Sequence, residues 1–153
     1  METIKIMLVD DEERFLATTE KLLTKKGVDV TTAASGAKAL EILQNKHIQV
    51  VILDVKMPGM DGNETLKEIK RQFPLVEVIM LTGHATVESA IDGLKSGATD
   101  YLMKPTDIDE LMTKTREAFQ KRQMLEEKIL MAQSRKYMKS PREILKEAEN
   151  PEH

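Results

Sequence analysis

Five polar residues stand directly after short apolar runs of this sequence. Asp10 and Asp11 follow the first run, Asp54 follows the third, Thr82 the fourth and Lys104 the fifth. Burying a lone carboxylate is costly unless it is paired, bound to a metal or placed at an exposed edge. We therefore expect these residues to meet at one edge of the fold and to form a site together.

The chemistry of such a site follows from its residue types. Three neighbouring carboxylates raise one another's pKa unless a cation neutralises them, and ligands that are all oxygen suit Mg²⁺. Lys104 and Thr82 can then hold the oxygens of a phosphoryl group, which a carboxylate accepts as an acyl phosphate. Because this transfer needs mainly positioning and charge neutralisation, the pattern predicts Asp54 as the nucleophile and Mg²⁺ as the cofactor.

The elements that must position these residues are predicted by hydrophobic periodicity. Strands are predicted over 4–9, 28–34, 48–53, 76–81 and 99–103, and helices over 12–26, after the N-cap residue Ser35, over 63–73 and 86–96, and from about 107. Five strands separated by helices of this length predict a parallel sheet with helices on both faces. The carboxyl ends of parallel strands share one edge, where ligands bind in such folds.

Composition narrows the class of protein. The 153 residues suffice for one domain with a full core, and 41% apolar with 32% charged residues is a globular composition. A net charge of −3 gives no argument for nucleic acid, and the lack of cysteine excludes disulfides and thiol chemistry. The N-terminal stretch METIKIMLVDDEE has no basic leader and no apolar run is long enough to cross a membrane, so we expect a cytoplasmic protein.

Five separated motifs resemble the receiver domain of two-component response regulators. They are Asp10-Asp11, Asp54 with Met57-Pro58-Gly59-Met60-Asp61-Gly62, Thr82-Gly83, Gly97-Ala98 with Tyr101, and Lys104-Pro105. The likeness covers about residues 3–122, and LTGHATVESAIDGLKSGATDYLMKP is further similar to receivers of sigma-54-dependent activators. It implies a flavodoxin-like doubly wound sheet in the order 2-1-3-4-5, with a receiver domain over 1–122 and a helical extension or linker over 123–153.

The resemblance also implies roles for the matching residues. Asp54 would be phosphorylated by a histidine kinase or phosphotransfer protein, and Lys104 would contact the phosphoryl group. Asp11, Asp54 and the backbone carbonyl of Lys56 would bind Mg²⁺, with Asp10 contributing through water.

A conformational switch is implied as well. Thr82 would bond to the phosphoryl group after transfer, and Tyr101 would move inward as Thr82 shifts. The helix over 86–96, the fifth strand and the last helix would carry the change to a partner.

Simpler interpretations of single residues stay open. Asp10 or Asp11 can N-cap the following helix, Lys104 can be a surface lysine, and Gly59 and Gly62 are assigned to turn geometry. A phosphohydrolase of the haloacid dehalogenase-like class would also carry a strand-end aspartate, but it would want a second Asp where this chain has Lys56. We therefore expect a signalling switch rather than a turnover enzyme.

The last third of the chain is basic. Residues 114–139 hold eight Lys or Arg against three Glu, and Met124, Met131 and Met138 recur every seven residues. Three interpretations of this segment stay open. The helix can continue to about 137 and form a homodimeric coiled coil, although Arg122 interrupts the apolar seam. The segment can instead dock on an acidic partner, or it can be a linker remnant. Ser140-Pro141 predicts a further short helix. No nucleic-acid docking motif is present, so no direct nucleic-acid binding is expected.

Two alternatives to a self-contained response regulator remain at this point. The chain can be the regulatory fragment of a larger transcription activator, or an interaction module that works without phosphate. The intact set of Asp10, Asp11, Asp54, Thr82 and Lys104 argues against the second alternative.

Overall fold

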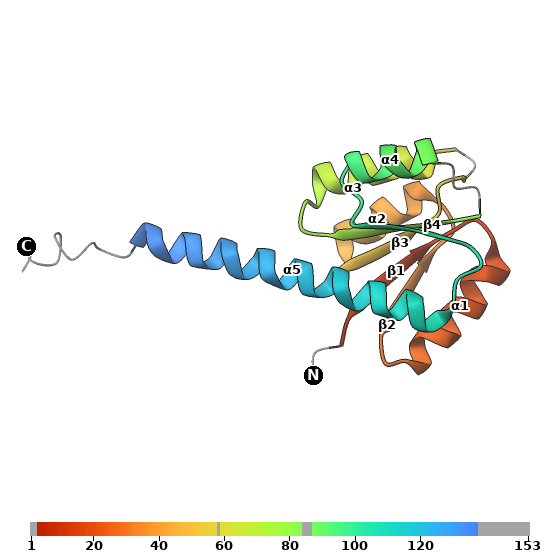
Figure 1. Ribbon diagram of the computed structural model, residues 1–153, viewed down its shortest axis with the longest axis horizontal. Coiled ribbons are helices and arrows are strands. Elements are labelled where there is room, and N and C mark those ends of the chain that lie inside the picture. The colour runs from red at the N-terminus through yellow and green to blue at the C-terminus, as the bar shows by residue number, and fades with distance from the viewer. Residues whose placement is uncertain (1–2, 58, 84–86, 138–153) are drawn as a thin grey trace, which may run out of the picture. The chain divides into compact units, whose positions relative to one another are not determined.

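The computed structural model describes residues 3–57, 59–83 and 87–137, and its contacts divide the chain into two units, Met1–Arg122 and Gln123–His153. The first unit is built around one parallel sheet in the order β2-β1-β3-β4-β5 (Figure 1). Its strands are β1 (Lys5–Val9), β2 (Asp29–Ala33), β3 (Val50–Leu53), β4 (Glu77–Thr82) and β5 (Asp100–Met103). The predicted sheet and strand order are thus confirmed, although Thr82 is the last residue of β4 and does not follow it.

Helices alternate with the strands as the periodicity predicts. They are α1 (Glu13–Lys25), α2 (Gly36–Asn45), α3 (Gly62–Gln72), α4 (Val87–Lys95) and α5 (Ile108–Tyr137). Local sequence sets several of their ends. Ser35 caps α2, as predicted, by accepting the Lys38 N–H at 3.1 Å, and Asp61 caps α3 by accepting the Glu64 N–H at 2.8 Å.

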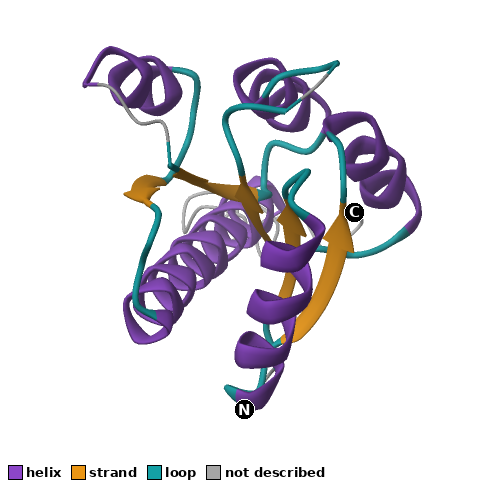
Figure 2. Ribbon diagram, turned by 90° about the vertical axis from the view of Figure 1, so that its right-hand side faces the viewer, coloured by secondary structure: helices purple, strands orange, loops and turns teal. Residues whose placement is uncertain are grey.

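The strands separate two apolar layers, because successive side chains of a strand point to opposite faces. Met7 and Val9 of β1 belong to the layer beneath α2 and α3, whereas Ile6 and Leu8 belong to the layer covered by α1 and α5. Figure 2 shows the sheet between these two groups of helices. Burial on both faces explains why β1 and β3 are almost entirely apolar, whereas the edge strand β2 has the sequence DVTTA and is only partly buried.

A polar cluster lies at the amino ends of the strands, opposite the predicted site. The buried Glu77 accepts a hydrogen bond from the Thr99 hydroxyl and lies 3.9 Å from the Lys121 ammonium. Lys70 donates to the carbonyls of Pro74 and Val76 at 3.0 and 2.9 Å. Glu77 stands at the start of an apolar run, and its place in the sequence predicts no such role.

Arg122 ends the packed part of α5. It is buried, and its Nη1 donates to the Ile48 carbonyl at 3.1 Å. The residue that interrupts the apolar seam is therefore an anchor to the amino edge of the sheet.

The second unit contains the remainder of α5, which is helical from Gln123 to Tyr137. Its large apolar side chains Met124, Ile129, Leu130 and Met131 are exposed. Met138 and the helix predicted from Ser140 lie outside the described residues. In the parts of the chain that the structure describes, no helix is both long and apolar enough to span a membrane.

Candidate functional site

The predicted polar residues meet at the carboxyl edge of the sheet. The backbone ladder continues past the strands and fixes them side by side: the Asp54 N–H donates to the Val9 carbonyl and the Lys104 N–H donates to the Thr82 carbonyl, both at 2.9 Å. Asp10 is held likewise, since its N–H donates to Ala33 at 3.1 Å.

Three carboxylates gather at this edge. Asp10, Asp11 and Asp54 each offer one oxygen, and these oxygens lie within 4.8 Å of one another. Asp10 and Asp54 are buried, whereas Asp11 is exposed. The alternative that Asp10 or Asp11 caps α1 is wrong, because the N-cap residue is Glu12 and its side chain makes no capping bond; Asp10 instead accepts the Glu12 N–H at 2.9 Å.

The electrostatic environment of Asp54 favours a bound cation. Burial and then the nearby Asp10 carboxylate raise the pKa of Asp54, while Lys104, a hydrogen bond from Thr82 and the Val55 N–H act in the opposite direction. A hard divalent cation would relieve the repulsion between the carboxylates, and oxygen atoms are the ligands such a cation takes. The donor set therefore fits Mg²⁺.

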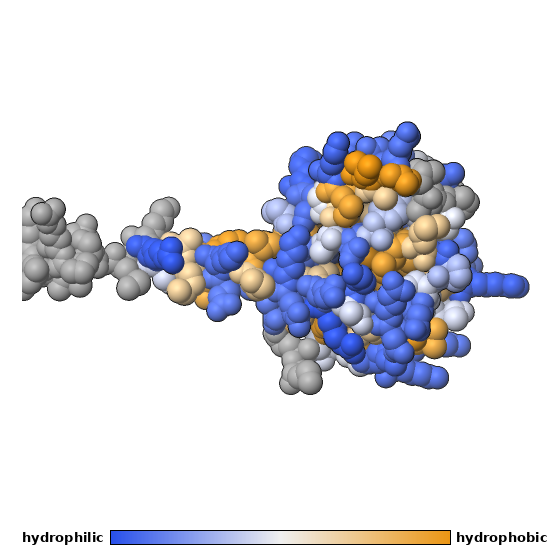
Figure 3. Space-filling view, in the orientation of Figure 1, coloured by the Kyte–Doolittle hydropathy of each residue, from blue (hydrophilic) through white to orange (hydrophobic). Residues whose placement is uncertain are grey.

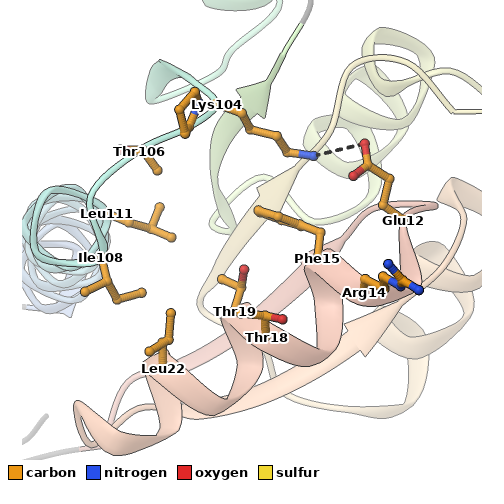
Figure 4. Close-up of a pocket in the computed structure, with 11 residues that line it drawn as sticks. Glu12, Arg14, Phe15, Thr18, Thr19, Leu22, Lys104, Thr106, Ile108 and Leu111 are labelled. Atoms are coloured by element: carbon orange, nitrogen blue, oxygen red, sulfur yellow. Dashed lines mark ion pairs between the residues drawn. The ribbon is translucent and has the colours of Figure 1, made fainter.

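Lys104 supplies the positive charge of the site. Its ammonium pairs with Asp10, and its side chain is only 15% exposed. The ammonium also lies 3.9 Å from a Glu12 carboxylate oxygen, a pair that Figure 4 shows. The Lys104-Pro105 peptide bond is cis. Lys104 is thus not a solvated surface lysine. It also lies at one end of a groove of about 530 Å³ between α1 and the start of α5, and the residues that line this groove include Phe15, Leu22 and Ile108.

Gly62 supports the backbone that carries Asp54. A Cβ at this position would lie 2.2 Å from the Asp54 carbonyl oxygen and 2.5 Å from the Val55 Cα, and the Gly62 N–H donates to Val55 at 2.6 Å. The assignment of Gly62 to turn geometry is therefore wrong: close approach of α3 to the site requires it. Gly59 does adopt a positive φ of 81°.

The remaining predicted residues surround this centre. Lys56 is exposed in the segment after β3. Thr82 is fully buried at the end of β4. Tyr101 of β5 is half-buried, and its hydroxyl is hydrogen-bonded at 3.2 Å to the Ser89 hydroxyl of α4.

Comparison with known proteins agrees with this geometry. The family model described as "Response regulator receiver domain" matches residues 6–116. The chain belongs to the response regulator receiver family. Its members form the receiver domains of two-component response regulators, which act as phosphorylation-dependent signalling switches. The two-component function predicted from the motifs is therefore confirmed.

Relatives of this receiver include larger regulators. It is 41% identical to the transcriptional regulatory protein ZraR of Klebsiella oxytoca, over 76% of this chain and 26% of that protein. It is also 41% identical to the DNA-binding transcriptional regulator NtrC of Escherichia coli K12, over 69% of this chain and 22% of that protein. The receiver thus spans about a quarter of the length of the curated relatives that it matches, and their names agree with the predicted likeness to receivers of transcription activators.

Solved structures share the fold. A CheY-like receiver domain from Methanospirillum hungatei superimposes with a TM-score of 0.77 at 30% identity, covering 80% of this chain and 98% of that one. NtrX from Brucella abortus gives a TM-score of 0.79 at 29% identity, covering 85% of this chain and 30% of that one.

Proposed function

We propose that this receiver accepts a phosphoryl group on Asp54 from a histidine kinase or phosphotransfer protein. The observation that carries the proposal is the company of the Asp54 carboxylate: it lies beside the Asp10 and Asp11 carboxylates, and the Lys104 ammonium and the Thr82 hydroxyl both interact with it. We place this exchange in the cytoplasm, where phosphodonors of this class act.

Mg²⁺ is the proposed cofactor. Asp11, Asp54 and the Lys56 backbone carbonyl would hold it directly, and Asp10 through water. When bound, the ion would neutralise the charge that gathers on the phosphoryl oxygens.

The protein's own residues supply the rest of the reaction. An oxygen of the ionised Asp54 forms a bond to phosphorus as the bond between phosphorus and the donor's imidazole nitrogen breaks, which leaves an acyl phosphate on Asp54. The Lys104 ammonium pairs with a phosphoryl oxygen, and the Thr82 hydroxyl donates a hydrogen bond to another. Because the group stays on the protein's own side chain until water removes it, the receiver is a switch and not a turnover enzyme.

The conformational change that follows phosphorylation would reach a partner through α4 and β5. Tyr101 joins them through the bond of its hydroxyl to Ser89. If Tyr101 moves inward when Thr82 shifts towards the phosphoryl group, this bond changes and with it the contacts of α4. Val87, Ile91 and Leu94 expose an apolar stripe on α4, visible as an orange patch at the top of Figure 3. We assign this stripe to the binding of a partner.

The second candidate function is the regulatory part of a larger transcription regulator. It is favoured by the share of ZraR and NtrC that the receiver matches, 26% and 22%. Pairing of two copies through the helix from Gln123 to Tyr137 would then join two receivers, and nucleic acid would be bound by another domain.

Chemical trapping tests the proposed acceptor. The protein would be treated with acetyl phosphate and Mg²⁺, reduced with borohydride, which converts an aspartyl phosphate to homoserine, and mapped by peptide mass spectrometry. We expect homoserine at position 54, and less of it in Lys104→Ala. Homoserine at another aspartate, or equal labelling of Asp54→Asn, would overturn the assignment.

A further inference from the structure

The ring of Phe15 lies beneath the charge of Lys104. The Lys104 nitrogen is 3.9 Å from the ring centroid, and Figure 4 shows both side chains at the head of the groove between α1 and α5. We propose that Phe15 is a positioning residue, whose ring holds the Lys104 ammonium where it can meet a phosphoryl group on Asp54. This inference rests on the proposed function of Asp54.

Besides the acceptor Asp54 itself, three groups attract the Lys104 ammonium, and they differ in whether they leave its charge available for a phosphoryl group. Asp10 pairs with it directly, but Asp10 is also a proposed cation ligand, so that pairing competes with the cofactor. Glu12 lies 3.9 Å away with a side chain 67% exposed, and water weakens such a pair. An aromatic face attracts a cation through its quadrupole and does not neutralise it. Phe15 is therefore the partner that keeps the ammonium in place while its charge stays available.

The ring is well placed for this task because the core holds it. Phe15 packs against the apolar layer between the sheet, α1 and α5. The other end of the lysine is fixed by the hydrogen bond from its N–H to the Thr82 carbonyl at 2.9 Å. A lysine side chain loses considerable rotamer freedom when it is ordered, and a contact made before the donor arrives removes that cost from the transfer step.

Two substitutions separate the ring's charge contact from its bulk. Phe15→Leu keeps an apolar side chain and removes the ring, whereas Phe15→Tyr keeps an aromatic face. Phe119→Leu is the matched control, because Phe119 lies in the same apolar layer on α5 and lines neither the site nor the groove. Acetyl phosphate serves as the donor, so that docking of a protein donor does not enter.

The first measurement is the NMR shift of the lysine ε-methylene protons, assigned with Lys104→Arg. A ring-current shift of the Lys104 signal is expected in the wild type, in Phe15→Tyr and in Phe119→Leu, and its loss in Phe15→Leu. The second is the rate of phosphorylation. We expect Phe15→Leu to be about fivefold to thirtyfold slower, which corresponds to about 1–2 kcal/mol of cation–π attraction at a largely buried lysine. The other two variants should be within about twofold of wild type. The melting temperature of each variant is measured as well, and a slower phosphorylation that accompanies a lower melting temperature is assigned to lost stability and not to positioning.

The outcomes distinguish this inference from the function on which it rests. A wild type that is phosphorylated but shows no ring-current shift at Lys104 overturns the positioning role of Phe15, and so do equal rates for Phe15→Leu and Phe119→Leu. A wild type that shows the shift but takes no phosphoryl group from acetyl phosphate or from its kinase overturns the proposed function, and with it any role of Phe15 in the reaction.

Discussion

Replacing Gly62 by alanine tests how closely α3 supports the phosphoryl-acceptor segment. The new Cβ would lie 2.2 Å from the Asp54 carbonyl oxygen and 2.5 Å from the Val55 Cα, so the two backbone segments must separate by about 1 Å to restore ordinary contact. Overpacking costs about 1–3 kcal/mol, and the upper end applies here because backbone atoms cannot rotate away. The higher helix propensity of alanine offsets up to about 1 kcal/mol of this loss of folding free energy. We expect a net loss near 2 kcal/mol.

Urea denaturation followed by far-UV circular dichroism measures this loss. A total stability of about 5–15 kcal/mol leaves the variant folded, so its phosphorylation by acetyl phosphate can be measured too, and we expect that rate to fall more than tenfold. Gly83→Ala is the control for stability: a Cβ there meets no atom of the described residues within 4 Å, and we expect a change below about 0.5 kcal/mol. A Gly62→Ala protein as stable and as readily phosphorylated as wild type would refute the close-approach argument.

Two further predictions concern buried carboxylates. Burial and Asp10 raise the pKa of Asp54, so its ionised form costs folding free energy at neutral pH, and this cost disappears as the pH falls through the raised pKa. Asp54→Asn should therefore stabilise the protein by about 1 kcal/mol near pH 7, with a gain that shrinks towards pH 4; urea melts that show a gain growing on acidification would contradict this. Glu77→Ala should cost about 2 kcal/mol, because it removes the carboxylate whose charge opposes the lowering of the Lys70 pKa by burial. Glu68→Ala removes only an exposed pair with Arg71 and should leave the melting temperature nearly unchanged. Equal drops in melting temperature for the two variants would contradict a special contribution of the polar cluster at the amino ends of the strands.

Much of the fold was predictable because its signals are local. The central strands β1 and β3 are apolar runs, each helix has its own periodicity, and residues such as Ser35 mark a helix start by their chemistry. The grouping of Asp10, Asp54 and Lys104 was predictable for a topological reason, since parallel strands bring their carboxyl ends to one edge.

The features that escaped prediction depend on contacts between distant parts of the chain. Phe15 and Lys104 meet only because α1 and the segment after β5 lie on the same side of the sheet. Glu77 looks like a defect in an apolar strand until Thr99 and Lys121 are placed beside it. Arg122 looks like a break in a seam until its bond to the Ile48 carbonyl is known. No periodicity within one element encodes such pairs.

The most direct test of the central claim is the intact mass of the protein after incubation with acetyl phosphate, in Mg²⁺ and in excess chelator. We expect the addition of one phosphoryl group in Mg²⁺, little in chelator, and none in Asp54→Asn. Addition that does not depend on Mg²⁺, or that persists in Asp54→Asn, would contradict the assignment of Asp54 as a metal-assisted phosphoryl acceptor.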